Sequence, residues 1–253
     1  MKQLELLHEG KSKLIYATDS AERIVVRFKD DATAFYNIKR AKIQNKARMN
    51  CEISSMVLGY LNENGVKTHF VERLDDEAQL CKVVKHIPVE VIVRNVIAGS
   101  MAKRLGIEEG IVPENTIFDL CLMDERLGDP LINDHHAVAL GVVTYEELAE
   151  IYAASARINS LLVELYAKVG VKLVDFKIEF GRSEDGALYL ADELTPATCR
   201  LWDVESGEPL DKARFRRDMG RVREAYEEVA KRLHNALNKL FWYAKRIIGY
   251  IWR

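Results

Sequence analysis

Three charged side chains share one face of the strand-like stretch VDFKIEFG, Val174 to Gly181. Its even positions are all apolar, and its odd positions carry Asp175, Lys177 and Glu179. A strand places alternate residues on opposite faces, so acid, base and acid follow one another on one side. A further carboxylate, Asp192, comes thirteen residues after Glu179 in the run ALYLADE.

The turn between these two runs indicates why the carboxylates could meet. Asp185-Gly186 predicts a two-residue hairpin turn, and that register places Glu179 directly opposite Asp192. Two carboxylates about 5 Å apart repel by roughly 3 kcal/mol at an effective dielectric of about 20. Lys177 could offset this, but Mg²⁺ fits better, because it prefers one or two carboxylates with phosphate oxygens and water. A solvated sheet face with adventitious charges is the alternative.

The stretch Gly10-Lys11-Ser12-Lys13 contains two lysines beside a glycine. It is not a P-loop, because the motif needs a glycine where Glu5 stands and a helix where LIYA follows. A strand–glycine–strand flap could still close over phosphates, with Lys11 and Lys13 as point charges. An ordinary turn with solvated lysines is the alternative.

Further candidates for anion binding follow predicted strands. Arg94 ends one strand, and Ser100 is a predicted N-cap of the next helix, which makes an anion site. Arg200 is a second phosphate clamp or a surface arginine stacked on Trp202. Asp129 lies in a turn that its own Asx geometry could explain. Together with the acidic hairpin, these groups could handle several phosphates with Mg²⁺.

The composition is that of an ordinary globular protein. The chain has 253 residues, 48% of them hydrophobic, and a formal net charge of −2, which gives no reason to expect a nucleic-acid partner. The four cysteines are far apart and form no CxxC pair. No leader and no run of about 18 apolar residues is evident, so a cytoplasmic location is expected.

The elements that must position these groups favour an α+β fold. Short antiparallel strands are expected over the first 85 residues, with one helix over 43–64 closed by Gly65. A capping box, Thr144 with Glu147, starts a long helix to Lys168.

The domain organisation is expected to be two lobes with a cleft between them. The boundary is placed at Ile87-Pro88, giving lobes 1–87 and 88–233. A last helix is predicted from about Asp211 to the C-terminus, and its end, 234–253, is an amphipathic tail with apolar residues near 3.5-residue spacing. Packing on its own body or on a second copy is favoured for the tail over membrane-surface attachment.

Several long stretches resemble the SAICAR synthetase family (phosphoribosylaminoimidazole-succinocarboxamide synthase), over about Leu7 to Leu233. They are EGKSKLIY, KDDATAF, IPVEVIVRNVIAGSMAKRLGIEEG, LGDPLIND, LVDFKIEFG, LADELTP and CRLWD. The resemblance implies an antiparallel ATP-binding lobe over a larger α+β lobe. It also implies a ligase that joins L-aspartate to carboxyaminoimidazole ribonucleotide, using ATP and Mg²⁺ and passing through an acyl phosphate. A homodimer is expected.

The resemblance also implies roles for individual residues. Mg²⁺ would be held by Glu179 and Asp192, with Lys177 beside the transferring phosphoryl group and Asp129 near the substrate carboxylate. The residues expected at ATP are Gly10, Lys11, Lys13 and Lys82, the last in the Lys82–His86 segment that could read adenine. Those expected at the ribonucleotide phosphate are Arg94, Ser100 and Arg200.

Departures from the family pattern occur at Tyr36-Asn37, Ala47 and Met123. They motivate one alternative, a catalytically impaired ATP-binding paralogue. A kinase-like phosphotransferase is the other. It would need HRD and DFG motifs, but the chain has no HRD, and Asp175-Phe176 is followed by Lys177.

Overall fold

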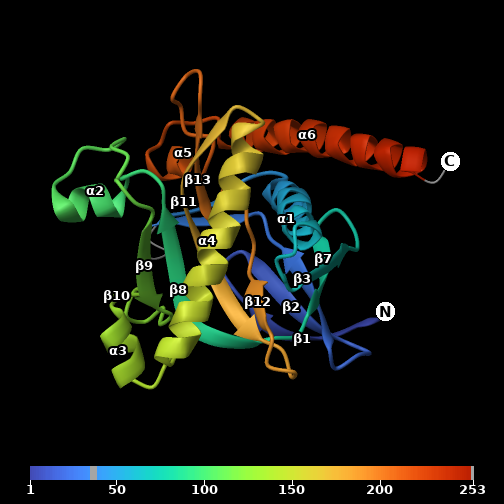
Figure 1. Cartoon of the computed structure of the whole chain (residues 1–253), viewed down its shortest axis with the longest axis horizontal. Coiled ribbons are helices and arrows are strands. Elements are labelled where there is room, and N and C mark those ends of the chain that lie inside the picture. The colour runs from blue at the N-terminus through green and yellow to red at the C-terminus, as the bar shows by residue number, and fades with distance from the viewer. Residues whose placement is uncertain (35–38, 252–253) are drawn as a thin grey trace.

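The computed structural model describes the backbone of residues 1–34 and 39–251, with the side chains up to Leu237 except that of Ala34. The N-terminal sheet is antiparallel and has the strand order β1-β2-β3-β7-β6 (Figure 1). Its strands are β1 Gln3–Glu9, β2 Lys13–Thr18, β3 Arg23–Phe28, β6 Phe70–Arg73 and β7 Ala78–Lys82. A separate hairpin pairs β4 Asp31–Ala34 with β5 Lys39–Lys42.

The second sheet is also antiparallel and runs β10-β9-β8-β11-β12, with β13 pairing the first half of β11. Its strands are β8 Lys85–Arg94, β9 Ile117–Leu122, β10 Leu131–Ile132, β11 Val171–Arg182, β12 Leu188–Ala191 and β13 Cys199–Asp203. The chain passes from one sheet to the other between Lys82 and Lys85, close to the predicted boundary. The division into lobes at residue 87 stays a prediction.

The two long helices predicted before the β11–β12 hairpin are both present. Helix α4, Tyr145–Ala167, begins at the predicted capping box of Thr144 with Glu147 and crosses the second sheet (Figure 1). Helix α1, Lys46–Glu63, starts three residues later than predicted, and Gly65 follows it with φ of 82°. The short helices are α2 Ser100–Leu105, α3 Asp134–Ala139 and α5 Ala213–Arg216. The α+β class is confirmed.

The prediction of one helix from Asp211 to the C-terminus was wrong. The segment contains α5 and then α6, Val222–Ile251, with a break between them. Asp218, Gly220 and Arg221 in that break have positive φ, which no right-handed helix allows. The Nζ of Lys39 donates to the Phe215 carbonyl and holds the break against the β4–β5 hairpin.

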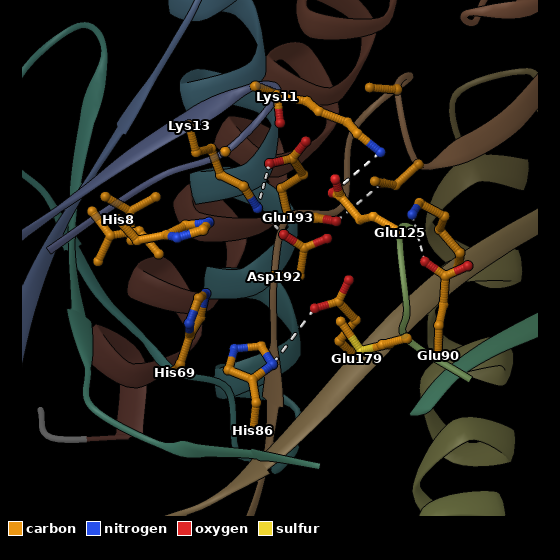
Figure 2. A pocket seen from close by; sticks show the side chains of 18 of the residues that line it. His8, Lys11, Lys13, His69, His86, Glu90, Glu125, Glu179, Asp192 and Glu193 are labelled. Carbon is orange, nitrogen blue, oxygen red and sulfur yellow. Dashed lines mark hydrogen bonds and ion pairs between the residues drawn. The ribbon is translucent and has the colours of Figure 1, made fainter. Parts of the chain in front are cut away.

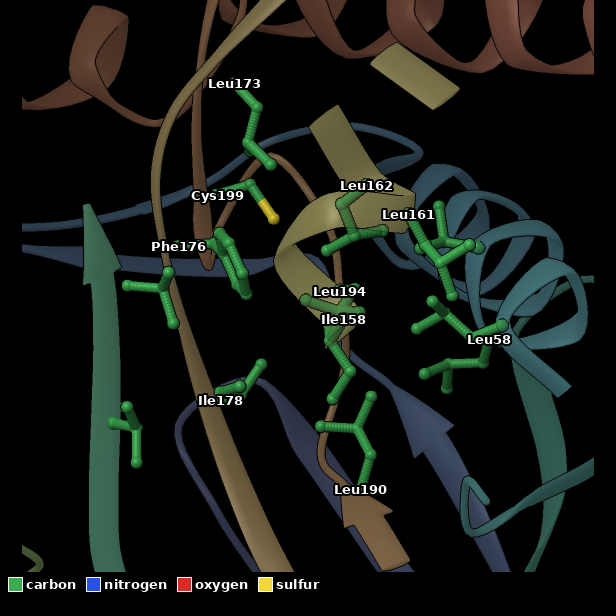
Figure 3. Close-up of a cluster of buried hydrophobic side chains, with 14 of the residues drawn as sticks. Leu58, Ile158, Leu161, Leu162, Leu173, Phe176, Ile178, Leu190, Leu194 and Cys199 are labelled. Carbon is green, nitrogen blue, oxygen red and sulfur yellow. The ribbon is translucent and has the colours of Figure 1, made fainter. Parts of the chain in front are cut away.

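A continuous apolar core lies between α4, α1 and the second sheet (Figure 3). Phe176, Ile178 and Phe180 of β11 are buried in it, as the alternation predicts, and Val174 is buried in a smaller cluster with Val96 and Ala98. Leu237 of α6 is buried as well. The tail prediction otherwise concerns side chains outside the described residues. Of the helices described, none is long and apolar enough to cross a membrane.

Candidate active site

The hairpin between β11 and β12 has a loop of three residues, where the sequence predicted two. Ser183 faces Ala187, and the Ser183 N–H donates to the Ala187 carbonyl at 3.1 Å. Gly186 adopts φ of 79° as the last loop residue, which is typical of a type I turn followed by a left-handed residue. The register therefore shifts by one, and Glu179 faces Ala191. The predicted opposition of Glu179 and Asp192 was wrong.

A carboxylate does face Glu179, but it comes from the strand on the other side of β11. Glu90 of β8 is its direct partner. Asp192 follows β12 with φ of 67°, and both it and Glu179 line the same cavity. Glu90 was missed because sheet order is not written in the sequence. The alternation in VEVIVRN was its only signal.

This cavity, here called the carboxylate cavity, has a volume of about 640 Å³ and lies between the two sheets (Figure 2). It contains the predicted phosphate-binding flap, the predicted metal ligands and both predicted catalytic residues. Those lining residues are Gly10, Lys11, Lys13, Lys82, Asp129, Lys177, Glu179 and Asp192.

Lys13 compensates the negative charge at the acidic end of this cavity. Its ammonium forms ion pairs with Asp192 and with Glu193, the latter at 2.8 Å (Figure 2). Burial would raise the pKa of Glu193, but Lys13, Lys46 and Lys177 lower it, so the carboxylate stays ionised. Glu193 and the buried Lys46 were both missed, although Glu193 directly follows Asp192.

Other cations in the cavity have distinct partners. Lys177 forms an ion pair with Glu90; burial opposes its charge, but Glu90 raises the net pKa above the usual value. Lys82 donates from Nζ to the Tyr189 hydroxyl at 3.0 Å, and its Nζ lies 4.7 Å from the centre of that ring. Lys11 pairs with Glu125 across the cavity mouth at 3.1 Å.

A second cavity of about 670 Å³ contains all three residues predicted to bind the ribonucleotide phosphate, Arg94, Ser100 and Arg200, and is here called the arginine cavity. One buried carboxylate, Asp175, holds both arginines: it accepts from Arg94 Nη1 at 3.2 Å and from Arg200 Nη1 at 2.6 Å. Arg94 Nε also donates to Asp119 at 2.7 Å. The guanidinium groups are therefore fixed before any anion binds.

Ser100 is the first residue of α2 and not its N-cap, so that prediction was wrong. The N-cap is Gly99, with φ of 60° and ψ of −125°, a conformation that favours glycine. The Gly99 N–H donates to the Glu109 carboxylate at 2.7 Å. A Cβ at Gly99 would lie 2.3 Å from Nη2 of Arg200, so only glycine leaves room for that guanidinium.

We expect Gly99→Ala to displace Arg200 and raise KM for the ligand of the arginine cavity by at least about tenfold, with KM for the ligand of the carboxylate cavity little changed. Gly106→Ala is the matched control. Gly106 ends the same helix with φ of 64°, but nothing lies within 4 Å of its missing Cβ. Steady-state kinetics measure both. Equal KM effects in the two variants would show that backbone strain, and not the guanidinium, is responsible.

The two cavities share one wall. Four residues line both: Lys177, Ala197, Thr198 and Lys212. The odd face of β11 follows the same path, because Asp175 lines the arginine cavity, Lys177 lines both, and Glu179 lines the carboxylate cavity. Lys177 therefore borders both cavities.

Two carboxylates, Glu179 and Asp192, are too few to hold a metal ion by protein ligands alone, but they are enough for Mg²⁺ bound together with phosphate. Within the described ranges, no cluster of three or more His, Cys, Asp or Glu side chains could hold a metal ion. Mg²⁺ needs only one or two carboxylates when phosphate and water supply the remaining oxygens. The lysines of the flap line the same cavity, so a phosphate there would complete such a site.

The departures from the family pattern fall differently in the structure. Tyr36-Asn37 lies outside the described residues. Ala47 is buried at the start of α1, and its N–H donates to the Asp30 carboxylate at 2.9 Å. Met123 lines the carboxylate cavity.

Comparisons with known proteins agree with this geometry. A family model described as SAICAR synthetase matches residues 6–233. The phosphoribosylaminoimidazole-succinocarboxamide synthase of Fusobacterium nucleatum is 55% identical over 92% of this chain and 98% of its own length. The synthase of Clostridium perfringens is also 55% identical, over 93% of this chain and 100% of its own.

Solved structures give the same result. The crystal structure of the synthase from Ehrlichia chaffeensis has a TM-score of 0.89 and 42% identity, covering 91% of this chain and 98% of that one. A SAICAR synthetase in complex with ADP has a TM-score of 0.87 and 39% identity, covering 90% and 97%.

Proposed function

The chain belongs to the SAICAR synthetase family, and we propose that its two adjoining cavities bring ATP and carboxyaminoimidazole ribonucleotide together. The enzyme is an ATP-dependent ligase of purine biosynthesis that joins L-aspartate to this ribonucleotide, with release of ADP and phosphate. The observation that carries the proposal is the shared wall at Lys177, where a phosphoryl group can pass from one cavity to the other.

ATP occupies the carboxylate cavity. The relative solved with ADP supports a nucleotide, and the flap supplies Lys11 and Lys13 for its phosphates, with Gly10 allowing close approach of the backbone. When ATP arrives, its phosphates take over Lys13 from Asp192 and Glu193. Lys82 ends β7, next to the short segment that connects the two sheets, and lies at the base end of the nucleotide.

Mg²⁺ would be held by Glu179 and Asp192, and when bound it would neutralise charge on the transferring phosphoryl group. In the free enzyme, the ammonium group of Lys13 balances the charge of Asp192. The ATP phosphates would draw Lys13 away and leave the Asp192 carboxylate available to Mg²⁺.

The ribonucleotide phosphate occupies the arginine cavity, bound by Arg94, Ser100 and Arg200. The carboxylate of this substrate then lies toward the shared wall, on the side of Asp129. A carboxylate is a poor acyl donor, so ATP first converts it to an acyl phosphate. Lys177 stabilises the phosphoryl charge during that transfer, and the amine of aspartate then attacks the acyl carbon.

The cellular setting stays a prediction. All four cysteines are buried free thiols, which suits a reducing cytoplasm.

The expected homodimer is supported by exposed apolar side chains on the edge strand β1, including Leu4, Leu6 and Leu7.

ADP release with each substrate omitted in turn tests the proposed function. The ligase predicts release that requires both L-aspartate and the carboxylated ribonucleotide. A kinase-like phosphotransferase would release ADP without aspartate, and an impaired paralogue would release none. Either result contradicts the proposal.

A further inference from the structure

Two lysines lie in the wall that both cavities share, and their electrostatic surroundings differ. Of the described residues lining both cavities, only Lys177 and Lys212 have ionisable side chains. Lys177 is paired with Glu90, whereas in the described part of the chain no carboxylate lies within ion-pair distance of Lys212 Nζ. One lysine is therefore a fixed cation, and the other has a free ammonium or amine.

The backbone holds Lys212 firmly in this wall. It is the N-cap of α5, and its N–H donates to the Pro196 carbonyl at 2.9 Å. The preceding carboxylate is directed elsewhere, because buried Asp211 accepts from the N–H groups of Leu201 at 2.8 Å and Ala213 at 2.6 Å.

The charges that face Lys212 are mostly positive. They come from Arg216 on α5, Lys46 on α1 and Lys177 on β11, with Glu193 after β12 as the opposing charge. Glu193 is already paired with Lys13. Burial first, and then these cations, lower the pKa of Lys212 to about 7. Its uncharged form is therefore available at neutral pH.

We propose that Lys212 is the general base that takes the first proton from the α-ammonium group of aspartate at the shared wall. This inference rests on the proposed function. The amine has to reach the acyl carbon where the two cavities meet, and Lys212 is the uncompensated basic group there. Two groups of one type with opposed environments divide the work: Lys177 keeps its charge for the phosphoryl group, and Lys212 loses it for the amine.

The step balances in atoms and charge. Neutral Lys212 takes one proton from the ammonium group of aspartate, and the freed lone pair forms the C–N bond at the acyl carbon. The C–O bond to phosphate breaks as the tetrahedral intermediate collapses. The second proton on nitrogen leaves with the phosphate, giving the amide, hydrogen phosphate and protonated Lys212, which then returns its proton to solvent.

Two nucleophiles separate this step from phosphoryl transfer. Hydroxylamine is already uncharged at neutral pH and needs no base, so it can trap the acyl phosphate in place of aspartate. In Lys212→Arg, which keeps the cation but cannot act as a base, we expect ADP release with hydroxylamine within about threefold of the parent. With aspartate we expect a loss of about 100-fold or more. Lys212→Met should behave alike.

The pH profile gives an independent readout. A base must be deprotonated, so the parent rate with aspartate should rise with pH through about 7, and this rise should be absent with hydroxylamine. Lys212→Arg should lose the rise. Lys172→Arg, an exposed position of β11 outside both cavities, should keep the parent profile.

The outcomes separate the inference from the function it rests on. Full activity of Lys212→Arg with aspartate, or an equal loss with both nucleophiles, overturns the role of Lys212 as base. Failure of the parent enzyme to release ADP with ribonucleotide and hydroxylamine would instead count against the acyl phosphate and hence against the proposed function.

Discussion

Glu179→Gln and Asp192→Asn are each expected to lower Mg²⁺-dependent turnover by about 1000-fold or more. Each change keeps the shape of the side chain and removes one negative charge that the metal needs. Asn also tolerates the φ of 67° at position 192, so the backbone should keep its path. The loss should therefore appear in kcat and in the Mg²⁺ dependence, with the melting temperature little changed.

Titration with Mg²⁺ under saturating ATP measures this effect, and thermal denaturation checks the fold. Glu184→Gln is the matched control, since Glu184 is an exposed carboxylate in the loop of the same hairpin. Normal turnover in both site variants would remove these carboxylates from the metal site. An equal loss in the control would show that the hairpin, and not its acidic groups, had been disturbed.

Lys177→Met should lower kcat by a similar factor of about 1000, because it removes the only described cation of the shared wall that has a carboxylate partner. It also leaves Glu90 without its cation. Burial already raises the pKa of Glu90, and Lys177 opposes that rise. Without Lys177, the pKa of Glu90 in the folded protein should rise further, so Glu90 should stay protonated up to a higher pH. The free energy of unfolding should then fall as pH rises toward this raised pKa, because ionising Glu90 leaves an unpaired buried charge.

A double variant separates the structural role of this pair from its catalytic role. Lys177→Met with Glu90→Gln removes both charges, so the melting temperature should recover at alkaline pH, while turnover stays low. Lys172→Met, an exposed change on the same strand, should leave both unchanged. Recovery of turnover in the double variant would contradict a catalytic role for Lys177.

The polar face of β11 was readable from the sequence because alternation is a local property. Its residues line both cavities as a face, with Asp175, Lys177 and Glu179 in order. The register was not readable, because loop length depends on the backbone angle at Gly186. One residue of slip was enough to replace Asp192 by Ala191 opposite Glu179.

The partners of these residues depend on contacts between distant segments. Glu90 faces Glu179 only because β8 and β11 are neighbours in the sheet. Asp175 on β11 joins Arg94 on the neighbouring strand β8 to Arg200 on the other neighbour, β13. No local sequence pattern indicated Lys212, because the charged groups around it come from α1, α5, β11 and the segment after β12. Local patterns identified the site, and the fold determines which residues act together.

Transfer of oxygen between the substrates tests the central claim most directly. The ribonucleotide, labelled with ¹⁸O in its carboxylate, is converted with ATP and L-aspartate, and the inorganic phosphate is examined by mass spectrometry. If a phosphoryl group passes across the wall at Lys177 to that carboxylate, each phosphate should carry one oxygen from the ribonucleotide. Phosphate without the label, at full conversion, would contradict the account.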